Sequence, residues 1–231
     1  MKLICFSLWG SNRTYTIGAL RNADLALSLF PEWKCLFYCL DSVPSEIVDE
    51  LHQRSNTLIR RVPGTSDDLD SRGMFYRFLP ADEKTVDYMV SRDTDSRLSE
   101  RERLAVEEWL TTGADLHVMR DHPYHGVPIL GGMWGAKGGK LKGISEAIQR
   151  FQPTSSKGQD QAFLRDWVWP KVTSGQLNVC VHDPFFQKAQ FPAKATRGAP
   201  NGGVSFIGQC FDENDRPNSD TDIKQLSSMV E

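Results

Sequence analysis

Short apolar runs alternate with amphipathic stretches along most of the chain. Six of these runs have the length and the branched or aromatic composition that are typical of buried strands. Each is followed by a turn or by a stretch with helical spacing of apolar residues. The predicted strands are Leu3–Leu8, Cys35–Leu40, Thr57–Val62, Val86–Ser91, Leu116–Met119 and Leu177–Val181.

The stretches between the runs predict helices. Pro31 ends the first of them, Pro44 stands near the start of the second, and Ser99 begins a capping-box pattern with Glu102. Strands that alternate with helices predict an α/β fold with a largely parallel central sheet flanked by helices. The expected helices cover residues 15–29, 45–51, 74–79, 100–110, 141–151 and 159–168.

The remaining segments bear on domain organisation. Residues 121–140 are rich in Gly and Pro and predict one long loop, a feature that is usually functional. No change of composition marks a domain boundary, so we expect one domain over residues 1–211. Residues 212–231 form a polar, acidic tail, for which two interpretations stay open: a solvated, disordered segment or the attachment point of a further domain.

Composition narrows the classes of function. Hydrophobic residues make up 39% of the 231 residues, enough for a sizeable core, and the net charge of −3 argues against a nucleic-acid-binding protein. No apolar stretch is long enough for a transmembrane helix. The N-terminal run lacks a cleavage site for a signal peptide, and the five cysteines include no C-x-x-C pair. We therefore expect a cytoplasmic protein with free thiols and no zinc knuckle.

The common phosphate-binding and hydrolase motifs are missing. The sequence contains no G-x-x-x-x-G-K-[ST], no G-x-G-x-x-G and no G-x-S-x-G. P-loop NTPases, standard dinucleotide-binding enzymes and the usual serine hydrolases are therefore excluded.

The most informative pattern is Asp93-Thr94-Asp95, directly after the strand that ends at Ser91. Ligands of open α/β sheets bind beyond the carboxyl ends of the strands. Two carboxylates at that edge can hold a divalent cation, which bridges the phosphates of a nucleoside diphosphate. Arg92 and Arg97 flank the pair and are candidates for phosphate contact. A plain turn or cap at these aspartates is the alternative.

Histidines follow two other predicted strands. His182 comes directly after a strand and would add a nitrogen ligand to the carboxylates, a set that suits Mn²⁺ as well as Mg²⁺. A capping or core histidine is equally compatible with its position. His122 and His125 lie in the long loop, where substrate contact and a plain loop role are both open.

The ordered set of segments around these residues resembles the metal-dependent glycosyltransferases of the GT-A fold. The resemblance is to the compact single-domain enzymes of large algal DNA viruses and some bacteria, and for a viral enzyme it implies the host cytoplasm. It is carried by residues 88–99, 119–123, 129–135, 158–164, 181–183 and 206–209.

The resemblance implies a role for individual residues. Asp93 and Asp95 match the D-x-D that binds the metal and the sugar nucleotide, and His182 matches a third metal ligand. A further set matches donor-binding positions for base, ribose, phosphates or sugar. This set is Leu8, Trp9, Gly10, Tyr15, Arg72, Arg77, Arg92, Thr94, Gly132, Trp134, Lys194 and Arg197. Solvated loop charges at Lys194 and Arg197, and a buried loop aromatic at Trp134, are equally compatible with the sequence.

The implied reaction transfers a sugar from a nucleotide diphosphate, UDP by default, to a hydroxyl group of a glycan. An inverting enzyme needs a carboxylate to deprotonate that hydroxyl group, and Asp160 and Asp121 are the candidates. A retaining enzyme needs no such base, and the sequence leaves the two open. Asp160 could also cap a helix, and Asp121 could also bind a sugar hydroxyl group.

Rival functions rank below this one. A phosphohydrolase with Asp93 as nucleophile needs its D-x-D on the first strand, whereas here the motif follows the fourth. A sugar-1-phosphate nucleotidyltransferase would carry a Gly-rich signature after the first strand. A sugar-nucleotide-binding module without turnover stays open.

Overall fold

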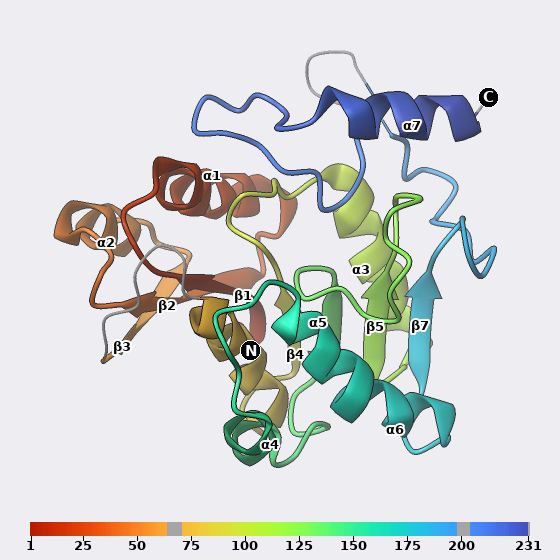
Figure 1. Ribbon diagram of the computed structural model, residues 1–231, viewed down its shortest axis with the longest axis horizontal. Helices are drawn as coiled ribbons and strands as arrows, with labels where there is room; N and C mark the ends of the chain where they lie inside the picture. The colour runs from red at the N-terminus through yellow and green to blue at the C-terminus, as the bar shows by residue number, and fades with distance from the viewer. Residues whose placement is uncertain (64–70, 198–203, 231) are drawn as a thin grey trace.

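One mixed sheet of seven strands, in the order β3-β2-β1-β4-β6-β5-β7, forms the centre of the molecule (Figure 1). The structure is a computed structural model that describes residues 1–63, 71–197 and 204–230. Strand β6 runs antiparallel to β4 and β5, and all other neighbours are parallel. The strands are β1 (Lys2–Leu8), β2 (Trp33–Leu40), β3 (Thr57–Val62), β4 (Tyr88–Ser91), β5 (Leu116–Met119), β6 (Trp134–Lys137) and β7 (Val179–His182).

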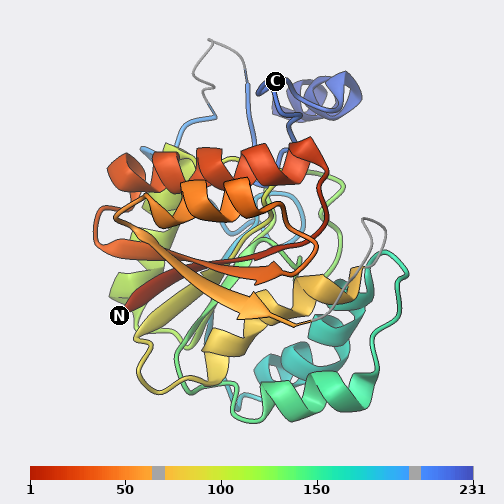
Figure 2. The same ribbon diagram turned by 90° about the vertical axis from the view of Figure 1, so that its left-hand side faces the viewer.

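Helices cover both faces of this sheet (Figure 2). One face packs against α1 (Arg13–Leu29), α2 (Ser45–His52) and α3 (Glu100–Thr112). The other face packs against the 3-10 helix η1 (Ser71–Asp82), α4 (Ile144–Phe151), α5 (Gln159–Phe163), the π-helix η2 (Leu164–Val168) and α6 (Trp169–Thr173).

The central strands are apolar along their length because both of their faces are covered. In β1, Leu3 and Cys5 pack toward η1, whereas Ile4 and Phe6 pack toward α1. Phe6 stacks on Phe37 of β2 with ring centroids 4.9 Å apart. Buried parallel strands read as continuous hydrophobic runs for this reason. The predicted fold class, a mostly parallel mixed sheet flanked by helices, is confirmed.

Strand β6 lies inside the stretch that the sequence predicted as a loop. Its four residues, Trp134–Lys137, include a glycine and an alanine, so no alternation of polar and apolar positions marks them as a strand. Their pairing with β4 on one side and β5 on the other supplies what the local sequence lacks. Residues 121–133 still form an irregular connection.

The last predicted helix, 159–168, is longer than expected. It begins as α5, passes through η2 and continues as α6 to Thr173. Pro170 stands in the first turn of α6, directly after the π-helix, in which the N–H of Trp169 bonds to the carbonyl oxygen of Leu164.

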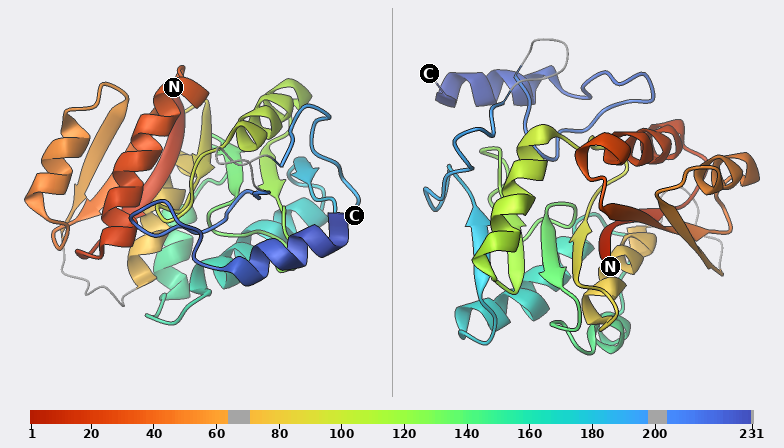
Figure 3. Two further views of the ribbon diagram at one scale, coloured as in Figure 1. Left: turned by 90° about the horizontal axis from the view of Figure 1, so that it is seen from above. Right: turned by 180° about the vertical axis from the view of Figure 1, so that it is seen from behind.

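The C-terminal segment folds back onto the domain. Helix α7 (Asp220–Val230) lies across the edge of the sheet at which β7 ends (Figures 1 and 3). Leu226 is fully buried, and His122 Nε2 lies 2.9 Å from the carbonyl oxygen of Asp222. Residues 204–230 therefore pack on the body of the protein. In the described part of the chain, no helix is long and apolar enough to cross a membrane.

Candidate functional site

A cavity of about 460 Å³ opens at the carboxyl ends of β1 and β4. Its wall combines the turn after β4, the start of the segment after β1, the loop before β6 and the first turn of α5. Many of the predicted site residues meet here. Those that line the cavity are Leu8, Trp9, Tyr15, Arg77, Asp93, Thr94, Asp95, Gly132 and Asp160.

Helix α1 holds the Asp93–Asp95 turn in place. Asn22 is fully buried, and its side-chain nitrogen donates to the carbonyl oxygens of Thr94 at 3.3 Å and Ser96 at 2.8 Å. Its side-chain oxygen accepts from the backbone N–H of Leu98 at 3.0 Å. Gly18 allows this approach, since a Cβ atom there would lie 2.0 Å from the carbonyl oxygen of Thr94.

Arg77 joins the D-x-D to α5. Its guanidinium group is almost completely buried; it donates to Asp93 and, at 3.0 Å, to Oδ2 of Asp160. It also donates to the carbonyl oxygen of Arg92 at 3.1 Å. One cation therefore fixes the two carboxylates relative to each other.

The carboxylates of the cavity are incompletely neutralised. Burial, and then the nearby Asp93, raise the pKa of Asp95 to about 6. Within the described part of the chain, no Arg or Lys pairs with Asp95. Burial also raises the pKa of Asp160, although Arg77 opposes this shift. Among the described residues that line the cavity, three are carboxylates and two, Arg77 and Lys157, are cations, so the site favours a further positive charge.

Carboxylate oxygens are suitable ligands for Mg²⁺ or Mn²⁺. The charge of Asp93 raises the cost of ionising Asp95, and a divalent ion would remove that cost. These two residues therefore fit the metal implied by the resemblance.

Two glycines form the opposite wall as bare backbone. A Cβ atom on Gly131 would lie 1.9 Å from Oδ2 of Asp160, and one on Gly132 would lie 1.9 Å from Oδ2 of Asp93. Ser91 Oγ fixes this segment by donating to the carbonyl oxygen of Gly131 at 2.7 Å. Both positions require glycine because any side chain would collide with the carboxylates.

Aromatic side chains lie on the side of β1. Trp9 packs against Gly73, where a Cβ atom would lie 2.9 Å from the indole ring. The Tyr15 side chain is partly exposed, and burial, followed by the charge of Asp95, raises the pKa of its hydroxyl group. This wall offers aromatic rings beside the carboxylates, which suits a planar base.

Several cavity residues were given no role from the sequence. Gln161 and Gly208 lie within residues 158–164 and 206–209, which carry the resemblance, whereas Lys157 and Cys210 lie outside those segments. Proximity to Asp160 could have indicated Lys157. Cys210 stands more than 110 residues after the D-x-D, so no local pattern links it to that motif.

The two loop histidines have different surroundings. His125 lines the cavity, and burial lowers its pKa to about 3, so the ring is neutral. Its Nδ1 accepts from the backbone N–H of Asp121 at 3.1 Å, which leaves the proton on Nε2. His122 instead packs on Phe206 and bonds to α7.

Asp121 and Arg197 do not line this cavity. Asp121 is fully buried and accepts two bonds from Arg101, one from Arg197 at 2.6 Å and one from the N–H of Ile207 at 3.0 Å. Its oxygens are therefore occupied, and it is not placed to act as a base. Arg197 bonds to Asp121, so its guanidinium group is not placed to contact a donor phosphate.

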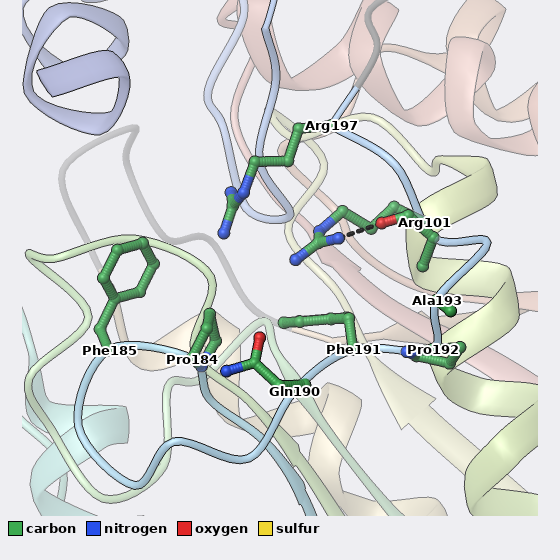
Figure 4. Close-up of a pocket in the computed structure, with 9 residues that line it drawn as sticks. Arg101, Pro184, Phe185, Gln190, Phe191, Pro192, Ala193 and Arg197 are labelled. Atoms are coloured by element: carbon green, nitrogen blue, oxygen red, sulfur yellow. Dashed lines mark hydrogen bonds between the residues drawn. The ribbon is translucent and has the colours of Figure 1, made fainter. Parts of the chain in front are cut away.

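Arg101 and Arg197 line a second cavity of about 420 Å³. Figure 4 shows both guanidinium groups on the same side of this cavity, with that of Arg101 above the ring of Phe191. Arg101 stacks on that ring with its guanidinium carbon 3.8 Å from the centroid. Asp121 therefore serves as the shared counter-ion of two arginines.

Two further predictions fail because the side chains point into the protein. Arg92 is buried and pairs with the buried Glu102, and it donates to the carbonyl oxygen of Trp134 at 3.1 Å. Trp134 is fully buried against Phe78. Neither side chain reaches the cavity, since both lie in the core between sheet and helices.

His182 is not brought to the carboxylates. Strand β7 is three positions from β4 in the sheet, a separation of about 14 Å at the usual spacing of strands. His182 is buried beside His117, with its Nδ1 2.8 Å from Nε2 of that residue. Its expected role as third ligand to the D-x-D metal is wrong for this arrangement.

Three other predicted residues lie outside the cavity lining. Gly10 has a φ of 69° and donates its N–H to Ser42 Oγ at 2.9 Å, so it turns the chain after β1. Arg72 and Lys194 are exposed.

No protein-family model and no curated protein matches the chain. Among solved structures, it is similar to the 4-diphosphocytidyl-2C-methyl-D-erythritol synthase of Anaerococcus prevotii, with 11% identity, a TM-score of 0.49 and coverage of 100% of this chain and 97% of that chain. It is also similar to a Mycobacterium tuberculosis protein crystallised with manganese, with 12% identity, a TM-score of 0.45 and coverage of 79% of this chain and 86% of that chain. For residues 1–349 of TarS from S. aureus, the identity is 10%, the TM-score is 0.47, and the coverage is 78% of this chain and 57% of that chain. These similarities concern the course of the backbone, and the chemistry follows from the site's own residues.

Proposed function

We propose that this protein is a metal-dependent glycosyltransferase of the GT-A type. It would move a sugar from a nucleotide diphosphate, UDP by default, to a hydroxyl group of a glycan. The observation that carries the proposal is the cavity at the carboxyl ends of β1 and β4, where Asp93 and Asp95 meet an aromatic wall and a bare glycine wall.

Different residues of the cavity would bind different parts of the donor. Trp9 and Tyr15 would take the base and ribose, and Asp93 and Asp95 would hold Mn²⁺ or Mg²⁺ at the diphosphate. Gly131 and Gly132 leave room for the carboxylates of Asp160 and Asp93 beside the loop before β6. The bound metal would supply positive charge to the departing diphosphate.

Asp160 would face the sugar. Arg77 holds its Oδ2, so the second oxygen is the one available to a ligand. In an inverting enzyme this oxygen takes the proton of the acceptor hydroxyl group, and in a retaining enzyme it binds a hydroxyl group of the donor sugar. With Asp121 enclosed by arginines, Asp160 is the better supported of the two original candidates.

Calorimetric titration of UDP into the protein, with and without Mn²⁺, tests the proposal. We expect binding that requires Mn²⁺ and is lost in Asp95→Asn. The matched control is Asp166→Asn, which changes an exposed carboxylate of η2 paired with Arg165. It should bind as the wild type does.

Two results would contradict the proposal. No detectable binding of UDP, GDP or dTDP in the presence of Mn²⁺ would exclude a nucleotide-donor site. Binding that survives Asp95→Asn would show that the D-x-D does not serve it. Binding without hydrolysis or transfer of any sugar nucleotide would favour the inactive binding module. The phosphohydrolase alternative is disfavoured because its nucleophile would have to follow β1.

A further inference from the structure

A second group of metal-ligating side chains lies apart from the cavity, between β5, β7 and α3. One nitrogen each of His117 and His182 and the sulfur of Cys180 all lie within 4.8 Å of one another. None of the three lines the cavity that contains the D-x-D.

The register of two parallel strands creates this cluster. His117 of β5 stands opposite Cys180 of β7, and Met119 stands opposite His182. Cys180 and His182 are two residues apart, so their side chains leave the same face of the strand. That face is the one covered by α3, because His117 stacks on Trp109 with ring centroids 5.2 Å apart.

Two imidazole rings face one another in this cluster. His117 is fully buried beneath α3, and among the described residues its Nδ1 has no hydrogen-bond partner, so Nε2 is the nitrogen directed at the cluster. Its Nε2 faces Nδ1 of His182 at 2.8 Å, so the rings direct nitrogens toward one another.

We propose that His117, Cys180 and His182 bind a Zn²⁺ ion, independently of the proposed function. Two imidazoles and a thiolate are ligands that Zn²⁺ prefers over Mg²⁺. Zinc–ligand bonds of 2.0–2.3 Å in a tetrahedron separate neighbouring ligand atoms by about 3.3–3.6 Å. The two facing nitrogens would therefore move apart by about 0.5 Å.

The surroundings admit an ion and water. Cys180 is partly exposed, and the Glu108 side chain is about half exposed. Glu108 Oε2 lies 3.9 Å from Nε2 of His182, the nitrogen that points away from His117. A carboxylate near the outer nitrogen of a ligating histidine is the usual orienting partner. Water would complete the fourth position.

Binding of Co²⁺ to the reduced full-length protein, pretreated with a chelator, tests the site. We expect one equivalent to produce the intense visible bands of tetrahedral Co²⁺ and a thiolate-to-cobalt charge-transfer band, with Zn²⁺ displacing both. Cys180→Ser should remove the charge-transfer band. The same substitution should weaken Co²⁺ binding by more than roughly 10–100-fold, which is the usual effect of losing a residue that only hydrogen-bonds to a metal ligand.

Cys210→Ser and Asp95→Asn are the matched controls, since both change the cavity and should leave the band unchanged. The metal-free thermal midpoint of Cys180→Ser should equal that of the wild type, which confirms that the variant folds. Absence of the band in the wild type, or its survival in Cys180→Ser, would overturn the proposal. Loss of the band in Cys210→Ser alone would place the cobalt in the cavity and overturn it too.

Discussion

At the scale of residues, neighbours in the sequence face different environments. Arg92 and Asp93 are adjacent, yet Arg92 pairs with Glu102 in the core and Asp93 faces the cavity. The cation that binds Asp93 is Arg77, which comes from η1. The sequence could identify the D-x-D by its place after a strand. It could not predict which arginine binds there, because the direction of each side chain depends on packing.

The raised pKa of Asp95 predicts a pH-dependent stability. A carboxyl group whose pKa is higher in the folded state adds stability below its unfolded pKa and loses it as pH rises through the folded value, here about 6. For the metal-free protein, we expect Asp95→Asn to raise the free energy of unfolding by about 1–3 kcal/mol above that pH. Urea denaturation between pH 5 and 8 measures this.

Asp166→Asn serves again as the control and should show no such trend. An advantage of Asp95→Asn that stays constant across this range would contradict the prediction, since it would arise from something other than ionisation.

At the scale of elements, α1 determines the position of the D-x-D although it carries none of its carboxylates. Gly18 lets the helix approach the turn, and Asn22 bonds to backbone groups of Thr94, Ser96 and Leu98. The sequence indicated the helix but gave no reason to connect its buried asparagine with a site 72 residues later.

Asn22→Ala should therefore loosen the turn. It leaves the buried N–H of Leu98 without its partner and removes one of the two bonds to the carbonyl oxygen of Ser96, which Arg97 still contacts, so we expect the free energy of unfolding to fall by about 1–3 kcal/mol. Urea denaturation checks this against Ser28→Ala, an exposed change on the same helix. A loss no greater than that of the control would contradict the role given to Asn22.

The order of strands explains both the successes and the failures at this scale. Apolar runs such as Cys35–Leu40 identify strands because burial on two faces demands them. His182 does follow a strand at the expected edge, but β5 and β6 stand between β7 and β4. Order in a sheet is a long-range property that local sequence does not encode. Strand β6 was missed for the related reason that its partners define it.

At the scale of the whole molecule, the C-terminal segment belongs to the site. The N–H of Phe211 donates to the carbonyl oxygen of Asp95 at 2.8 Å. Arg97 follows the D-x-D and binds Asp215 at 2.8 Å and the carbonyl oxygen of Asp212 at 3.0 Å. The Asp215 carboxylate of the predicted tail thus pairs with Arg21 and Arg97 of the domain, which composition alone could not reveal.

Arg97→Gln should weaken Mn²⁺-dependent UDP binding about tenfold, because each lost charged hydrogen bond costs about 1.5–3 kcal/mol and part of this holds the cavity wall. Calorimetry measures the change. Arg103→Gln, which breaks only surface pairs with Glu100 and Glu107, is the control. Equal UDP affinities of Arg97→Gln and Arg103→Gln would show that the C-terminal segment does not contribute to the site.

The reversed direction of β6 gives the two sides of the cavity unequal stiffness. The strand starts where β4 ends, so Gly131 and Gly132 lead directly into hydrogen-bonded ladders on both sides. The wall formed by Gly208 and Cys210 is attached to the domain largely by side chains and single backbone bonds. A ligand entering between them presses on one wall that cannot yield and one that can. We therefore expect adjustment to substrates of different size to occur in the C-terminal segment, while the glycine wall keeps its position.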